Sequence, residues 1–151
     1  MKRVMWVTAA VAVAAAVGIA QAQFEKPEDA IKYRKSSMFL TAAHFKNLGA
    51  VVQGKVQYDK EAFSRDAGIV KLMANLPWQA MAEPGTDKGD TTLSRAAFSE
   101  REKFTAVAES FQNATAKLAE LASAGDLDAA KGQFGAVAGT CKSCHSQFRT
   151  K

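Results

Sequence analysis

Two cysteines and a histidine stand within five consecutive residues near the end of this chain, in the segment CKSCH at positions 141–145. Only six residues follow His145 in a chain of 151. If this segment is helical, its three functional side chains share one face, because residues three and four apart on a helix are neighbours. A group bound there must therefore lie along one helix, and contacts to its other side must come from earlier in the chain.

The C-x-x-C-H pattern is typical of haem c attachment, in which both thiols add to the vinyl groups and the histidine supplies an axial nitrogen to iron. Two alternatives stay open. A thioredoxin-type redox pair also reads C-x-x-C, but it normally sits in a βαβ context that this sequence does not predict. A structural zinc site needs four ligands, and the only other Cys or His in the chain is His44. A disulfide between Cys141 and Cys144 would close a very small loop and stabilise little.

The first 22 residues are predicted to be a cleaved signal peptide. Lys2 and Arg3 precede an apolar run over 4–20, and Ala-Gln-Ala at 20–22 has the small-x-small cleavage pattern. An uncleaved anchor is the alternative, although the run is just short of the roughly 20 residues that span a membrane. We expect a mature protein of residues 23–151, exported to the periplasm of a Gram-negative type of bacterium and not attached to the membrane after cleavage.

The charge of the chain is modest. The formal net charge is +5, and removal of Lys2 and Arg3 with the signal peptide leaves 18 basic against 15 acidic residues, or +3. These charges are dispersed along the sequence, so they do not favour nucleic acid as a partner. The remaining 129 residues are enough for one domain with its own core.

The composition predicts an all-α fold, an antiparallel four-helix bundle. Ala, Lys, Glu, Gln and Leu dominate, and no alternating strand pattern is present. Helical periodicity and breakers predict helices from about Pro27 to Gly49, from Asp59 as N-cap to about Leu76, from Ser94 to just before Gly125, and from Asp126 as N-cap onwards. The segment 77–92 between the second and third helices contains two prolines and two glycines, so we predict a long loop without regular helix that edges the cofactor pocket.

The chain resembles cytochrome c′, the class II c-type cytochromes. The resemblance rests on EDAIKYRKSSM in the first helix, LPW and PGT in the middle, the AGDLDAAK turn and GTCKSCHSQFR at the end, and it covers residues 23–151. It implies a four-helix bundle that carries one haem c, bound covalently through Cys141 and Cys144. It also implies that His145 is the proximal iron ligand.

Further site residues follow from the same resemblance. Met38 matches the apolar residue that hinders the distal side of iron, and Arg34 matches an arginine near a haem propionate. These two residues are four positions apart, so they share a helix face. His44 lies about 120° around the helix from Met38, which predicts a surface or bundle-edge residue and not a second axial ligand.

Three charged residues complete the expected site. Arg149 follows His145 by four residues, and we expect it one helical turn further on, where its guanidinium tunes the proximal imidazole. Lys35 and Asp90 are expected to contact propionates or the haem edge by analogy. Trp78, Phe104 and Phe111 are expected to be pocket or core aromatics.

The resemblance implies a five-coordinate haem protein for one-electron transfer and for binding of the diatomic gases NO and CO, not an enzyme. The alternative is a six-coordinate, low-spin electron carrier in which the Met38 thioether binds iron. Redox partner proteins and a homodimer formed through the first two helices are expected from the family.

Overall fold

The structure is a computed structural model that describes residues 23–150, so the predicted signal peptide lies outside the described residues. The described chain is helical, with a single isolated bridge between Leu93 and Arg149. Its helices are α1 (Pro27–Val52), α2 (Lys60–Met73), α3 (Pro77–Ala82), α4 (Ala96–Ser99), α5 (Arg101–Ala124) and α6 (Leu127–Phe148).

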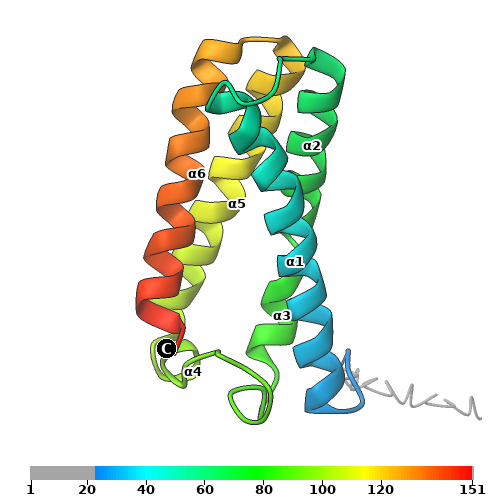
Figure 1. The fold of residues 1–151 in the computed structure, drawn as a ribbon. Coiled ribbons are helices and arrows are strands. Elements are labelled where there is room, and N and C mark those ends of the chain that lie inside the picture. The colour runs from blue at the N-terminus through cyan, green and yellow to red at the C-terminus, as the bar shows by residue number, and fades with distance from the viewer. Residues whose placement is uncertain (1–22, 151) are drawn as a thin grey trace, which may run out of the picture.

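The long helices α1, α2, α5 and α6 form an antiparallel four-helix bundle (Figure 1), as the sequence predicts. α6 packs mainly against α5, and α2 packs against both α1 and α5. In contrast, α1 and α6 touch only sparsely, and their ribbons diverge towards the end of the bundle that holds the chain's C-terminus (Figure 1). This divergence leaves α1 and α6 free to form opposite walls of a site.

The predicted helix caps are present. The Asp59 carboxylate accepts a hydrogen bond from the Ala62 backbone N–H at 2.7 Å, and Asp126 accepts one from Ala129 at 3.0 Å. Gly125 ends α5 with a φ of 84°, a left-handed conformation in which a side chain would be strained. Because one residue, Asp126, then separates Gly125 from α6, α5 and α6 must run antiparallel.

The bundle is held by two apolar clusters. The larger one joins all four long helices through Leu48, Phe63, Val70, Leu118 and Val137, all almost fully buried. Complete burial of side chains of this size stabilises the fold by roughly 1.5–3 kcal/mol each. The smaller cluster lies beside the site and contains Ala97, Phe104 and Phe148.

The segment 77–92 contradicts the prediction of a loop without regular helix, because α3 occupies its first six residues. Pro77 stands in the first turn, where a missing N–H costs nothing, and Pro84 comes after the helix has ended. The Trp78 indole N–H also donates to the Ala74 carbonyl at 2.6 Å, which ties α3 back to the end of α2. The two prolines therefore bracket the helix instead of preventing it.

Three other boundaries differ from the prediction. α1 continues through Gly49 to Val52. Gly49 is therefore not an end signal: it is buried under the Phe134 ring, where a Cβ would lie 3.1 Å from that ring. α2 ends at Met73, three residues early. The predicted third helix is divided into α4 and α5, because Glu100 (φ −118°, ψ 49°) departs from helical geometry between them.

Among the helices between residues 23 and 150, none is both long enough and apolar enough to cross a membrane.

Candidate functional site

A cavity of about 710 Å³ lies between α1 and α6. Phe104 and Phe111 of α5 close its inner side, and residues 90–93 of the connection form part of its edge, as predicted for that segment. Its volume is within the range of about 300–1,000 Å³ typical of cofactor pockets. It is open to solvent, since several residues that line it, including Phe39 and His145, are exposed.

Both cysteines line this cavity as half-buried free thiols. Burial raises the pKa of the Cys141 thiol, and burial followed by the nearby Cys141 raises the pKa of Cys144 to about 11. A catalytic thiol pair needs a lowered pKa, because the thiolate is the nucleophile. The site therefore argues against a thioredoxin-type redox pair.

His145 lies on the same wall, on the last turn of α6. Desolvation lowers the pKa of its imidazole, and the positive charge of Arg149 lowers it further. A neutral imidazole keeps a ring nitrogen free to bind a metal ion.

The three groups face one cavity without converging on one point. Within residues 23–150, no group of three or more His, Cys, Asp or Glu side chains is arranged to hold a metal ion. The alternative of a structural zinc site is therefore not supported. Side chains spread along one helix face and beside an apolar cavity instead suit a broad, flat group that is attached at its edge and bound at its centre.

The opposite wall of the cavity comes from α1. Met38 is half-buried there, and Ala42 and Phe45 continue the apolar surface along the helix. Thr41 adds a hydroxyl, but this hydroxyl donates to the Ser37 carbonyl at 2.8 Å. The α1 wall is thus mainly apolar, with Met38 facing the cavity that His145 lines from the other side.

Arg34 is buried, with 4% of its surface exposed, and its guanidinium connects α1 to the connection that follows α2. It donates to the carbonyl oxygens of Ala80 (3.4 Å) and Thr86 (2.6 Å) and to the hydroxyl of Thr91. Burial lowers the pKa of Arg34, and the negative charge of Asp87 partly offsets this. Sequence reasoning missed this clamp, because carbonyl partners have no residue-type signature. Arg34 also lines the cavity, so its contact with a propionate stays a prediction.

Lys35 and Asp90 meet at the cavity edge, with Nζ and Oδ2 2.6 Å apart. The hydrogen bond from Lys35 and then its positive charge lower the pKa of the Asp90 carboxyl. Both side chains are exposed, so this pair adds little to stability. The structure brings together two residues that were each predicted to contact the haem, and it pairs them with one another.

Arg149 differs from the prediction in its backbone. α6 ends at Phe148, and Arg149 is extended (φ −118°, ψ 129°) and bridged to Leu93, not one turn further along the helix. The reason is that residues 92–94 pair with the end of the chain. The Ser94 N–H donates to the Phe148 carbonyl, and the Thr150 N–H donates to the Thr92 carbonyl, both at 2.8 Å. Arg149 still lines the cavity, and its charge still acts on the pKa of His145.

His44 lies outside the cavity, as predicted. Its Nδ1 is 2.8 Å from the Asp66 Oδ1, a half-buried contact that joins α1 to α2. Trp78 packs edge-on against Phe104 and Phe111, so these aromatics belong to the core beside the cavity, and the two phenylalanines also line it.

A helical bundle whose last helix presents C-x-x-C-H to an apolar cavity defines a c-type haem protein. The family model for cytochrome c′ matches residues 29–149. Cytochrome c′ of Alcaligenes xylosoxydans xylosoxydans is 40% identical over 129 residues, which cover 85% of this chain and 99% of that protein. The chain therefore belongs to the cytochrome c′ family, and its cofactor is haem c.

Solved structures agree with this assignment. The crystal structure of cytochrome c′ from Rubrivivax gelatinosus superposes with a TM-score of 0.81 at 38% identity, covering 85% of this chain and all of that one. A nitric oxide complex of a cytochrome c′ variant from Alcaligenes xylosoxidans gives a TM-score of 0.79 at 39% identity, with 85% of this chain and 99% of that chain covered.

Proposed function

We propose that this protein is a periplasmic, five-coordinate haem c protein that transfers single electrons and binds NO and CO. The observation that carries this proposal is the cavity whose two walls differ: α6 offers Cys141, Cys144 and His145, and α1 offers Met38 within an apolar surface. Bound haem supplies an iron that changes between the ferric and ferrous states and can hold a sixth ligand.

The residues have separate tasks in this proposal. Cys141 and Cys144 hold the haem covalently, and the neutral imidazole of His145 is the proximal ligand. Met38 restricts access from the α1 side, and Arg149 limits the basicity of His145 through its positive charge. Arg34, Lys35 and Asp90 are available to the propionates at the polar edge of the cavity.

Gas binding is supported by relatives. Neighbouring structures include a nitric oxide complex and a carbon monoxide-bound variant of cytochrome c′ from Alcaligenes xylosoxidans. The apolar part of the α1 wall, formed by Met38, Phe39, Ala42 and Phe45, carries no acid–base side chain for peroxide cleavage, so we propose a carrier and gas-binding protein, not an enzyme.

The alternative is a six-coordinate electron carrier in which Met38 ligates iron. The half-buried Met38 thioether lines the same cavity as His145, which supports this second candidate. Visible spectra separate the two candidates. The five-coordinate protein is expected to be high-spin and to shift when CO is added to the ferrous form. A ferrous protein that is low-spin and whose spectrum does not change when CO is added would exclude the five-coordinate candidate.

Export and assembly belong to the same proposal. Cleavage after Ala22 is expected to give a mature chain that begins at Gln23, which mass spectrometry of the periplasmic fraction would test. A homodimer is expected from the family, and sedimentation equilibrium of the purified holoprotein would measure it.

A further inference from the structure

We propose that the mouth of the cavity between α1 and α6 is a docking surface for an acidic redox partner protein. This inference rests on the electron-transfer function proposed above. We define the cationic mouth as the four exposed residues Lys35, Lys46, Lys142 and Arg149.

The first observation is how charge is distributed along the chain. No acidic residue occurs between Asp29 and Asp59, a stretch that contains almost all of α1. None occurs after Asp128, so nearly all of α6 also lacks carboxylates. The acidic side chains of the other two long helices are Glu61, Asp66, Glu102, Glu109 and Glu120. These stretches of the two helices that flank the cavity therefore carry cations without carboxylates, whereas α2 and α5 carry charges of both signs.

The second observation is the helix register of these cations. On α1, Lys46 follows Ala42 by four residues and Phe39 by seven, and both of those residues line the cavity. On α6, Lys142 lies four residues after Ala138 and three before His145, which also line it. Residues at such spacings share one helix face. Lys46 and Lys142 therefore continue the cavity walls onto the surface.

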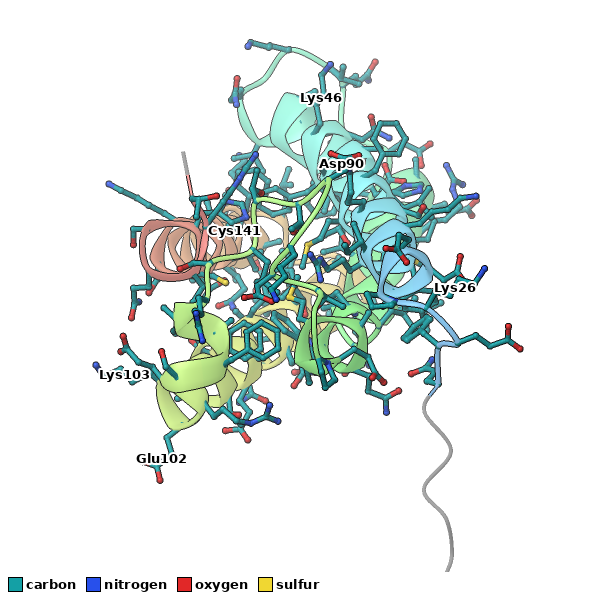
Figure 2. All side chains as sticks on the ribbon, turned by 90° about the horizontal axis from the view of Figure 1, so that it is seen from below. Lys26, Lys46, Asp90, Glu102, Lys103 and Cys141 are labelled. Atoms are coloured by element: carbon teal, nitrogen blue, oxygen red, sulfur yellow. The ribbon has the colours of Figure 1, made fainter. Side chains whose placement is uncertain are left out.

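Figure 2 places the mouth relative to the rest of the molecule. Lys46 on α1 and Cys141 on α6 lie on one side of the bundle axis, whereas Glu102 and Lys103 of α5 point away on the opposite side. Lys46 of the cationic mouth and Glu102 of α5 therefore face different directions around the bundle.

The third observation is the balance of charge at the opening itself. Asp90 is the one carboxylate among the residues that line the cavity, and Lys35 pairs with it at 2.6 Å. The residues that line the cavity thus include one carboxylate and three cations, Arg34, Lys35 and Arg149. Lys46 and Lys142 add two exposed cations on the helices that form its walls. Phe39 lies on α1 between Lys35 and Lys46 and is 73% exposed, so it adds an apolar contact among these cations. Transient electron-transfer encounters typically use small interfaces and are steered by opposite charges.

The test begins with two small oxidants of opposite charge, ferricyanide and tris(phenanthroline)cobalt(III). In each reaction the ferrous haem iron gives one electron to the reagent, which becomes ferrocyanide or the cobalt(II) complex, and no bond or proton changes. The double variant Lys46→Glu/Lys142→Glu is compared with Lys103→Glu/Lys117→Glu on α5, which alters the net charge equally. Visible spectra first verify that each variant carries haem.

The mouth variant is expected to react about tenfold more slowly with ferricyanide at low salt and faster with the cobalt complex. The α5 variant is expected to stay within about twofold of the unmodified protein, because its changes lie on α5 and not on the two helices that form the opposite walls of the cavity. The Debye length is about 10 Å at 0.1 M salt. All differences should fade near 1 M salt, where this length is about 3 Å.

Binding of a protein is measured separately, with oxidised plant-type ferredoxin as an acidic probe and calorimetry of the ferric holoprotein as readout. The Kd is expected to rise about tenfold in the mouth variant and to change little in the α5 variant.

Equal effects of both variants, or no salt dependence, would overturn the proposal. Binding to phosphatidylcholine–phosphatidylserine vesicles but not to ferredoxin would reassign the mouth to a membrane surface. A holoprotein that neither oxidant oxidises would instead overturn the proposed electron-transfer function.

Discussion

The Arg34 guanidinium donates a 2.6 Å hydrogen bond to the carbonyl oxygen of Thr86, a residue 52 positions later in the chain. Through this bond and its companions to Ala80 and Thr91, the first helix holds the connection that forms an edge of the haem cavity. Arg34 is thus a structural link as well as a candidate propionate contact.

Arg34→Met is expected to destabilise the holoprotein by about 3 kcal/mol, because hydrogen bonds from a charged group are worth about 1.5–3 kcal/mol each and the freed carbonyls need new partners. Urea unfolding followed by the visible haem band measures this change. Lys32→Met is the matched control, since Lys32 is an exposed cation on the same helix. Equal urea midpoints for the Arg34 and Lys32 variants would contradict the stabilising role of the Arg34 hydrogen bonds.

Met38→Ala is expected to accelerate CO binding to the ferrous protein by about tenfold, which corresponds to about 1.4 kcal/mol of lost steric hindrance. Met81→Ala is the control, because it removes the same atoms from the cavity edge on α3. Stopped-flow spectroscopy gives both rates. If Met38 ligates iron instead, the spectrum itself changes from low-spin to high-spin in Met38→Ala, and Met81→Ala leaves it unaltered.

Lys35→Met is expected to raise the pKa of the Asp90 carboxyl towards its ordinary value of about 3.9, because the hydrogen bond and charge that lower it are removed. The folded-state pKa is depressed, so the stabilising contribution of this pair is present above about pH 4 and is lost as the pH falls through the folded value. Carbon-13 NMR titration of the carboxyl group measures the shift. An unchanged pKa would mean that Lys35 binds elsewhere in the holoprotein, with a propionate the first candidate.

Gly125→Ala is expected to destabilise the protein by about 1–2 kcal/mol, because Gly125 has a φ of 84° and a Cβ there would lie 3.0 Å from the Lys60 side chain. Gly132→Ala within α6 is expected to have the opposite sign, a gain of about 0.5–1 kcal/mol, because a Cβ there meets open space on a helix. Thermal unfolding of both variants provides the comparison. Two shifts of the same sign would argue against this assignment of the turn.

Helical periodicity was sufficient to predict the four long helices, because their apolar residues recur at three- and four-residue steps. Asp59, Gly125 and Asp126 were also predictable as end signals, since capping depends on a side chain and its nearest backbone groups. The prediction was wrong where distant packing decides the outcome. Gly49 lies within α1 where the Phe134 ring leaves no room for a Cβ, and α3 forms between two prolines.

The sequence by itself determined the cofactor chemistry of this protein. The spacing of Cys141, Cys144 and His145 places three functional groups on one helix face, whatever the helix packs against, and C-x-x-C-H is the pattern typical of haem c attachment. Tertiary structure alone decided what surrounds that face. Arg34 holds the connection after α2, Lys35 pairs with Asp90, and Arg149 leaves the helix to bridge Leu93. Each of these partners is at least 46 residues away along the chain, so local sequence patterns do not predict the pairing.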